Sequence, residues 1–327
     1  MASYIGKRLL LLIPVLLGIA LVVMIIIDIT PGDPARMMLG AQATQEQVDA
    51  LREELQLNDP LPVRYVRYMG NVLRGDFGTS LMSKRPVVKE MMTRFPYTVK
   101  LVTLGTLFSV LIGIPLGIFA ATHQRTWKDN AAIFISLIAV SMPSFWFALL
   151  LIRFFGVHLR WLPISGVDTW KGWVMPCAAM ALGLAAIIAR QVRSDMLEVI
   201  RQDYITTARA KGLSEGKVIY RHALKNAMIP VIMVIGGIFG SSLGGSLITE
   251  VIYSIPGLGQ YIMTGLNNRD YPVIQSGILI ISAMFAVIIL LVDVIFALVD
   301  PRIRLQYVRK GRRKESKDEE QKKVAAA

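Results

Sequence analysis

A short stretch rich in serine and glycine matches a hydrolase pattern. Residues 240–244 read GSSLG and fit G-x-S-x-G, in which a sharp strand-to-helix turn exposes a nucleophilic serine. Such a serine needs a histidine nearby as a general base. The three histidines, His123, His158 and His222, fall between apolar stretches, whereas GSSLG lies inside one. The placement of the histidines therefore argues against a serine hydrolase.

The sequence also lacks complete motifs for phosphate binding and for metal binding. Residues 75–78 read GDFG, but the other motifs of protein kinases are missing. The sequence contains no G-x-x-x-x-G-K-[ST], so it has no phosphate-binding loop of that type. The lone Cys177 provides neither a disulfide nor a thiolate metal site, and we expect it to be a packing residue. We predict a non-catalytic chain that binds no metal and no cofactor directly.

The composition indicates an all-α membrane protein. Of the 327 residues, 54% are apolar and only 18% are charged. A helix needs about 20 mostly apolar residues to cross a hydrocarbon core of roughly 30 Å. Six stretches predict six transmembrane helices, and the fourth, which is short, is expected to continue as a helix beyond the bilayer. They cover residues 9–29, 99–121, 131–155, 174–189, 229–251 and 273–299.

Basic residues in the loops predict the orientation. With the N-terminus inside, the inner segments hold 22 Lys and Arg residues, against 3 in the short outer loops. Because Lys and Arg stay on the cytoplasmic side, both termini are expected there. The net charge of +13 then reflects membrane topology and not nucleic-acid binding. The predicted organisation is a tail and first helix over 1–29, an extracytoplasmic helical subdomain over 30–97, a core membrane domain over 98–304 and a basic disordered tail over 305–327.

The extracytoplasmic segment has helical signals of its own. Thr44 followed by Gln47 fits a capping box, and apolar residues recur behind it at helical spacing. A second short helix is predicted from a stripe formed by Val63, Val66, Met69 and Leu73. Two interpretations remain open for this subdomain: it meets a soluble partner, or it shields the helix bundle.

The loop over 190–228 predicts two helices joined by a tight turn. Lys211 suits the last turn of the first helix, and Gly212 suits the left-handed conformation that ends it. Ser214 is placed to cap a second helix. That helix has an apolar face of Ile219, Tyr220, Ala223 and Ala227 and a basic face of Lys217, Arg221 and Lys225.

Small residues recur in the fifth apolar stretch. Gly236, Gly240 and Gly244 stand at i, i+4 and i+8, a spacing that lets two helix backbones approach closely. We predict a helix-packing seam, either within the chain or against a partner helix. Three ionisable residues, Asp28, Arg153 and Asp293, lie in or near apolar stretches, where a place at the membrane interface, a bond between helices or a place on a substrate path is open.

Seven motifs in order resemble one family. The sequence is similar to the inner-membrane permease subunits of binding-protein-dependent ABC importers, in the branch that handles oligopeptides, dipeptides and nickel. The motifs are TPGDPARMMLG (30–40), RGDFGTSLMSKRPV (74–87), SMPSFWFALLL (141–151), RSDMLEVIRQDYITTARAKGLS (193–214), TEVIYSIPGLGQYI (249–262), NRDYPVIQSG (268–277) and LLVDVIFALVDPRIR (290–304).

The resemblance implies a role for the loop over 190–228. In this family the loop docks on a separate ATPase subunit and couples its closure to the permease helices. The broader family's motif begins Glu-Ala-Ala, whereas this sequence has Thr206, Thr207 and Ala208, so an acidic contact at 206 is not carried over. The expected coupling residues are Thr206, Thr207, Ala208, Arg209, Ala210, Lys211 and Gly212.

The resemblance also implies partners and cargo. It implies a second homologous permease subunit, two ATP-binding subunits that use the ATP, an extracytoplasmic substrate-binding protein and a bacterial inner membrane. Di- or oligopeptides are the expected cargo, with nickel or another small solute as the alternative. A secondary transporter would show inverted repeats and an ionisable relay in mid-membrane, and neither is visible in the sequence.

Overall fold

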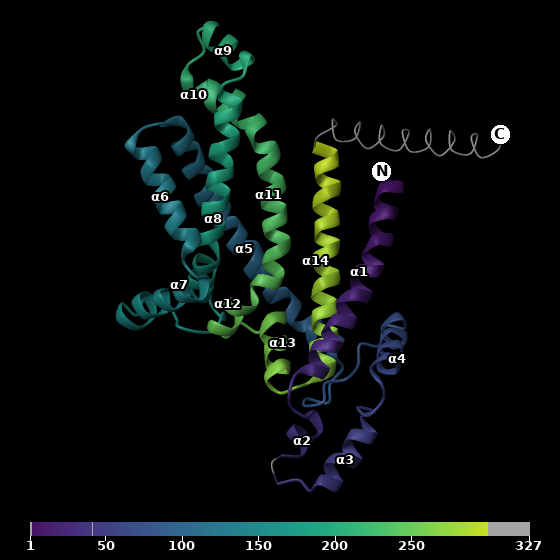
Figure 1. The fold of residues 1–327 in the computed structure, drawn as a ribbon. Helices are drawn as coiled ribbons and strands as arrows, with labels where there is room; N and C mark the ends of the chain where they lie inside the picture. Colours follow the sequence, from purple (N-terminus) through teal and green to yellow (C-terminus); the bar gives the residue numbers. More distant parts are fainter. Residues whose placement is uncertain (1, 41, 300–327) are drawn as a thin grey trace, which may run out of the picture.

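The structure, a computed structural model, describes residues 2–40 and 42–299 (Figure 1). The predicted tail over 305–327 lies outside these residues. Within them, regular structure is helical apart from one isolated bridge between Thr79 and Pro86. The elements are α1 (Ala2–Ile29), α2 (Pro34–Leu39), α3 (Gln45–Glu54), α4 (Leu61–Leu73), α5 (Val87–Thr122), α6 (Trp127–Ser141), α7 (Ser144–Leu151), η1 (Ile152–His158), α8 (Trp170–Ile200), α9 (Asp203–Ala210), α10 (Glu215–Lys217), η2 (Val218–Ala223), α11 (Leu224–Gly245), α12 (Leu247–Ile252), α13 (Leu258–Asn267) and α14 (Tyr271–Val299), where η marks a π-helix.

The predicted all-α membrane fold is confirmed. Five helical segments of the described residues are long and apolar enough to span a membrane. The pair formed by α6 and the α7–η1 helix provides a sixth span if the two are counted together. The five segments are Leu10–Ile29, Val87–Thr122, Trp170–Ile200, Glu215–Gly245 and Tyr271–Val292.

The prediction of one continuous helix over 131–155 is wrong. The chain bends by 97° between α6 and the α7–η1 helix. Met142 is extended at the bend, with φ −77° and ψ 121°, and Pro143 follows it. A proline disfavours the helical conformation in the residue before it and has no N–H to donate, so the break falls where these two residues meet.

Helix α8 is the centre of the bundle. The predicted short stretch over 174–189 is the middle of this helix, which continues beyond the apolar residues as expected. Its contact with α5 is the most extensive between any two described helices. A Cβ atom at Gly113 or Gly117 of α5 would lie 2.6 Å from the carbonyl oxygen of Ala185 or Ala189, respectively. Only glycine at both positions allows the two backbones to come this close.

The short helices gather at the two ends of the bundle (Figure 1). Helices α9 and α10 lie at the same end as the N-terminus of α1, whereas α2, α3 and α13 lie at the opposite end. Helix α1 packs on α14, which in turn packs on α11. Helices α9 and α10 of the loop over 190–228 and helices α2 and α3 of the segment over 30–97 therefore lie at opposite ends of the bundle.

Candidate functional site

Residues 190–200 of the loop over 190–228 continue α8, and after a break at residues 201 and 202 the loop forms a short helix that ends in a glycine turn. Helix α9 ends at Ala210, and Gly212 has a φ of +76°, in the left-handed region that favours glycine. The amide of Gly212 donates to the carbonyl of Arg209 at 2.9 Å. The predicted glycine stop is confirmed, and it reverses the chain toward the second helical segment.

A small apolar core fixes α9 to the end of α8. Ile205 and Ala208 of α9 belong to one buried cluster with Val192 and Met196 of α8 and with Val218 of η2, on which α9 packs. Helix α9 is therefore seated on α8 and cannot swing separately from it without exposing this core.

Six of the seven predicted coupling residues face outward. Ala208 is the exception, since it is only 7% exposed and belongs to the loop's own core. Its small size lets α9 approach α8 and η2, and it offers no surface for a partner. The exposed residues of the set are Thr206, Thr207, Arg209, Ala210, Lys211 and Gly212.

Arg209 pairs within the loop. Its guanidinium donates to the carboxylate of Glu215 at 2.6 and 3.1 Å, across the Gly212 turn. The hydrogen bonds to Glu215 raise the pKa of Arg209 above its usual value. Because both groups are largely exposed, this pair adds little stability, but it sets the direction of the guanidinium. Ser214 precedes the second helical segment as predicted, although its side chain makes no capping hydrogen bond.

The second helical segment differs from the predicted amphipathic helix in two respects: it runs on into α11 without a break, and part of it is a π-helix. Residues 218–223 form a π-helix, whose wider turns shift the faces relative to an α-helix. Tyr220, predicted on the apolar face, is therefore 64% exposed, and Val218 is buried instead. Lys217, Arg221 and Lys225 are exposed as predicted.

A buried ion pair braces the start of the loop. The Asp129 carboxylate of α6, only 2% exposed, accepts from Arg193 Nε at 2.7 Å and from Nη2 at 2.8 Å. The amide of Arg125 donates to the same carboxylate at 3.2 Å. These bonds tie α6 to the part of α8 that carries α9. Nothing in the local sequence pairs residues 64 positions apart, so sequence reasoning missed this contact.

A second carboxylate anchors the segment over 30–97 at the other end of the bundle. Asp270 is 2% exposed and accepts from Ser80 Oγ at 2.6 Å, from the Leu81 amide at 3.0 Å and from the Met82 amide at 3.2 Å. The turn between α13 and α14 thus holds the loop that precedes α5. Ser276 Oγ also donates to the carbonyl oxygen of Phe77 in GDFG at 2.6 Å, so two of the seven motifs, residues 74–87 and 268–277, meet here.

A third carboxylate organises the turn between α12 and α13. Glu250 is fully buried and accepts from Thr98 Oγ1 at 2.7 Å and from Ser246 Oγ and the Gln260 amide at 3.1 Å. A Cβ atom at Gly257 would lie 2.4 Å from the carboxyl carbon of Glu250. The glycine in SIPGLG therefore leaves room for the carboxylate.

The glycines at 236, 240 and 244 lie in α11, and two of them face α14. A Cβ atom at Gly236 would lie 2.3 Å from a methyl carbon of Val292, and one at Gly240 would lie 3.0 Å from Ile289. Gly244 has no such neighbour within 4 Å. Gly236 and Gly240 thus pack against another helix of this chain, whereas Gly244 has open space beside it.

The three intramembrane ionisable residues have different surroundings. Asp28 forms an ion pair with Arg64 of α4. Arg153 is exposed in η1, and the side chain of Asp293 lies outside the described side chains. The ion pair of Asp28 gives it a structural role at the end of α1.

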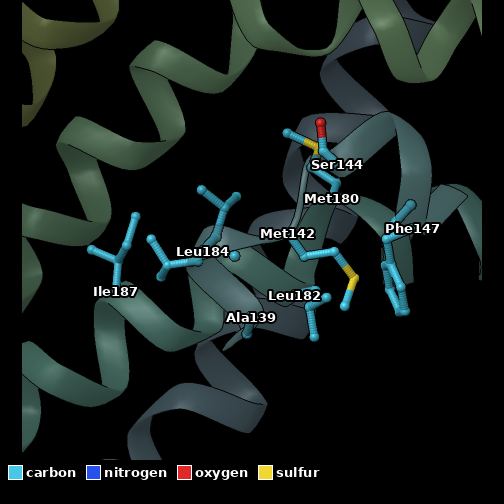
Figure 2. Close-up of a pocket in the computed structure, with 11 residues that line it drawn as sticks. Ala139, Met142, Ser144, Phe147, Met180, Leu182, Leu184 and Ile187 are labelled. Carbon is cyan, nitrogen blue, oxygen red and sulfur yellow. The ribbon is translucent and has the colours of Figure 1, made fainter. Parts of the chain in front are cut away.

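An apolar pocket lies where α6 and α7 meet α8. Its volume is about 230 Å³, and residues from all three helices line it, among them Ala139, Met142, Phe147, Met180 and Leu184 (Figure 2). Ser144 contributes the only side-chain hydroxyl of this lining. The pocket offers space for apolar groups, and its lining carries no acid or base.

The chain belongs to a known family of membrane transport components. The family described as the binding-protein-dependent transport system inner membrane component matches residues 113–305, and the N-terminal part of such membrane components matches residues 1–102. The family predicted from the seven motifs is thereby confirmed, and the chain is a multi-pass inner-membrane permease.

Relatives match over nearly the whole length. The dipeptide transport system permease protein DppB of Alkalihalophilus pseudofirmus is 43% identical over 93% of this chain and 100% of its own. The glutathione transport system permease protein GsiC of Escherichia coli strain K12 is 40% identical over 93% of this chain and 99% of its own. The inward-facing MetNI methionine ABC transporter shares the fold, with a TM-score of 0.57 and 19% identity over 64% of this chain and 96% of that one.

The Asp129–Arg193 pair generates a prediction about stability. Asp129→Leu alone leaves Arg193 without its buried partner, and removing one member of such a pair costs about 3–5 kcal/mol. Replacing both, as Asp129→Leu with Arg193→Met, removes the uncompensated charge and should recover much of that loss. Thermal unfolding of the purified assembly measures both variants. A double variant as unstable as the single one would show that the pair does not act as a unit.

Proposed function

We propose that this chain is a permease subunit of an ABC importer for peptides. The observation that carries the proposal is that relatives 43% and 40% identical, each aligned to 93% of this chain, are permeases for dipeptides and for glutathione, itself a tripeptide. Di- and oligopeptides are therefore the proposed cargo. The chain forms half of the pathway, beside a second homologous permease chain.

The proposed orientation places the loop over 190–228 in the cytoplasm, together with both termini. The excess of Lys and Arg in the inner segments supports it. The segment over 30–97 then lies on the opposite side, where it meets the substrate-binding protein that delivers the cargo. The separation of these two regions by the spanning helices agrees with this assignment (Figure 1).

The proposed coupling surface is the exposed tip of the loop. It consists of Thr206, Thr207 and residues 209–212, which project from a core that fixes them to α8. One of two ATP-binding subunits docks on this tip, hydrolyses ATP and moves α8 through it. This chain binds no ATP itself in the proposed mechanism, and its part is to transmit the movement.

Energy dependence tests the transport function. The complete assembly, reconstituted in proteoliposomes, should take up a radiolabelled dipeptide only when ATP is supplied on the side of the coupling surface. Uptake should persist when ionophores collapse the membrane potential and the proton gradient. Uptake that follows either gradient and ignores ATP would contradict an ABC importer.

Ala210→Trp tests the coupling surface. Ala210 is exposed and lies outside the loop core, so the larger side chain obstructs docking without disturbing the fold. We expect the ATP-binding subunits to bind at least about tenfold more weakly, which corresponds to roughly 1.4 kcal/mol. Co-purification and dipeptide uptake measure the effect.

A matched control uses the same substitution at the other end of the molecule. Ala50→Trp changes an exposed alanine of α3 and should leave the ATP-binding subunits attached. If both variants retain these subunits equally, the ATP-binding subunits do not dock on residues 206–212.

A further inference from the structure

Helix α4 has its polar and apolar faces reversed relative to a helix exposed to water. Arg64 and Tyr68 face inward and line a pocket between α4, α1 and α14. The apolar side chains of Val63, Val66 and Leu73 face outward and are 48, 70 and 86% exposed. A helix on a soluble surface buries its apolar stripe and exposes its polar one. The predicted stripe was Val63, Val66, Met69 and Leu73; all but Met69, which is half-buried, point away from the protein.

A hydrogen bond places α4 at the depth of the membrane. The hydroxyl of Tyr65 donates to the carbonyl oxygen of Leu17 at 3.0 Å. The apolar span of α1 covers Leu10–Ile29, so Leu17 lies about 18 Å of helix axis from the end of that span, at 1.5 Å per residue. The backbone of α4 at Tyr65 must lie within one tyrosine side-chain length of the Leu17 carbonyl oxygen. Helix α4 therefore lies beside the apolar part of α1 and not beyond its end, as its position along α1 in Figure 1 also shows.

The charged side chains of α4 are paired, as expected for a helix at membrane depth. Arg64 pairs with Asp28 at the end of α1, and Arg67 pairs with Asp59. The inward pocket, with a volume of about 200 Å³, collects polar groups from Tyr68 and Asn71 as well. Charged groups at membrane depth are expected to be paired or turned toward the protein interior. Val63, Val66 and Leu73 are uncharged, and the charge of the exposed Arg67 near them is paired with Asp59.

We propose that α4 lies in the membrane leaflet on the side of α2 and α3, with Val63, Val66 and Leu73 in contact with lipid acyl chains. The neighbouring helix α1 exposes an apolar surface of the same kind, with Val22 and Ile26 54 and 57% exposed. Helix α4 contacts α1, so the two apolar surfaces belong to neighbouring helices. The segment over 30–97 is thus held at a fixed depth, with α4 in the leaflet and α2 and α3 outside the membrane.

Spin labelling of the complete assembly in lipid nanodiscs tests the position of α4. In a Cys177→Ala background, single nitroxide labels at Val66→Cys, Val22→Cys and Glu53→Cys report collisions with oxygen, which dissolves in lipid, and with a water-soluble nickel complex. Val22 is the lipid reference on α1, and Glu53 is the exposed aqueous reference on α3. We expect the ratio of oxygen to nickel collisions at Val66 to match Val22 and to exceed that at Glu53 several-fold.

Two results would overturn the proposal. A label at Val66 that behaves like Glu53 would place α4 in water, and one shielded from both reagents would place it against a protein partner. Leu73→Cys provides a second label on the same stripe and answers the same question if the Val66 variant does not assemble. Dipeptide uptake by each variant shows that the labelled assembly is intact.

Discussion

The close backbone contact between α5 and α8 is the constraint on which the arrangement of the other helices depends. Gly113 and Gly117 let the two helices approach until a Cβ atom on either would meet a carbonyl oxygen of α8. Helices in lipid gain no hydrophobic driving force from associating, so such close packing is what holds them together. It fixes α8, and α8 in turn carries the Arg193 brace and the apolar core of the loop. The loop is therefore positioned by packing that begins in the middle of the membrane.

Buried carboxylates connect the remaining parts. Asp129, Asp270 and Glu250 are each nearly inaccessible, and each is surrounded by donors from a different helix or loop. An uncompensated buried charge is costly, so each carboxylate requires its donors in place and thereby specifies one arrangement of the chain. Asp270 does this for the segment over 30–97, and Asp129 does it for the loop at the other end. At both ends of the molecule, a buried carboxylate thus holds two parts of the chain together through hydrogen bonds.

Local signals in the sequence predicted local features well. Five of the six apolar stretches, the capping box of Thr44 and the turn at Gly212 depend on residues that are close in the sequence, and the structure confirms them. The break at Pro143 was also a local signal, but hydropathy alone treated the stretch as continuous. Tyr220 was misplaced because a π-helix changes the helical period and nothing in the pattern marks it.

Contacts between distant residues could not be predicted in this way. Asp129 and Arg193, or Asp270 and Ser80, are joined by the fold and not by spacing. The seven motifs included most of these residues without revealing their partners. For α4 the stripe was visible, but the direction it faces follows from the exposure of its side chains, and its depth follows from the hydrogen bond of Tyr65 to α1. The sequence thus defined the family and the candidate loop, while the structure was needed to show how the loop is braced.

Rigid attachment of the loop to α8 is most directly tested by a distance measurement. Spin labels at Thr206 and Ile187, both exposed, span the junction between α9 and the membrane part of α8. If the loop core and the Asp129 brace hold, double electron–electron resonance on the complete assembly should give the same mean distance without nucleotide and with ATP. A shift of several ångströms, or a second distance that appears only with ATP, would show that the loop moves on α8 instead of with it.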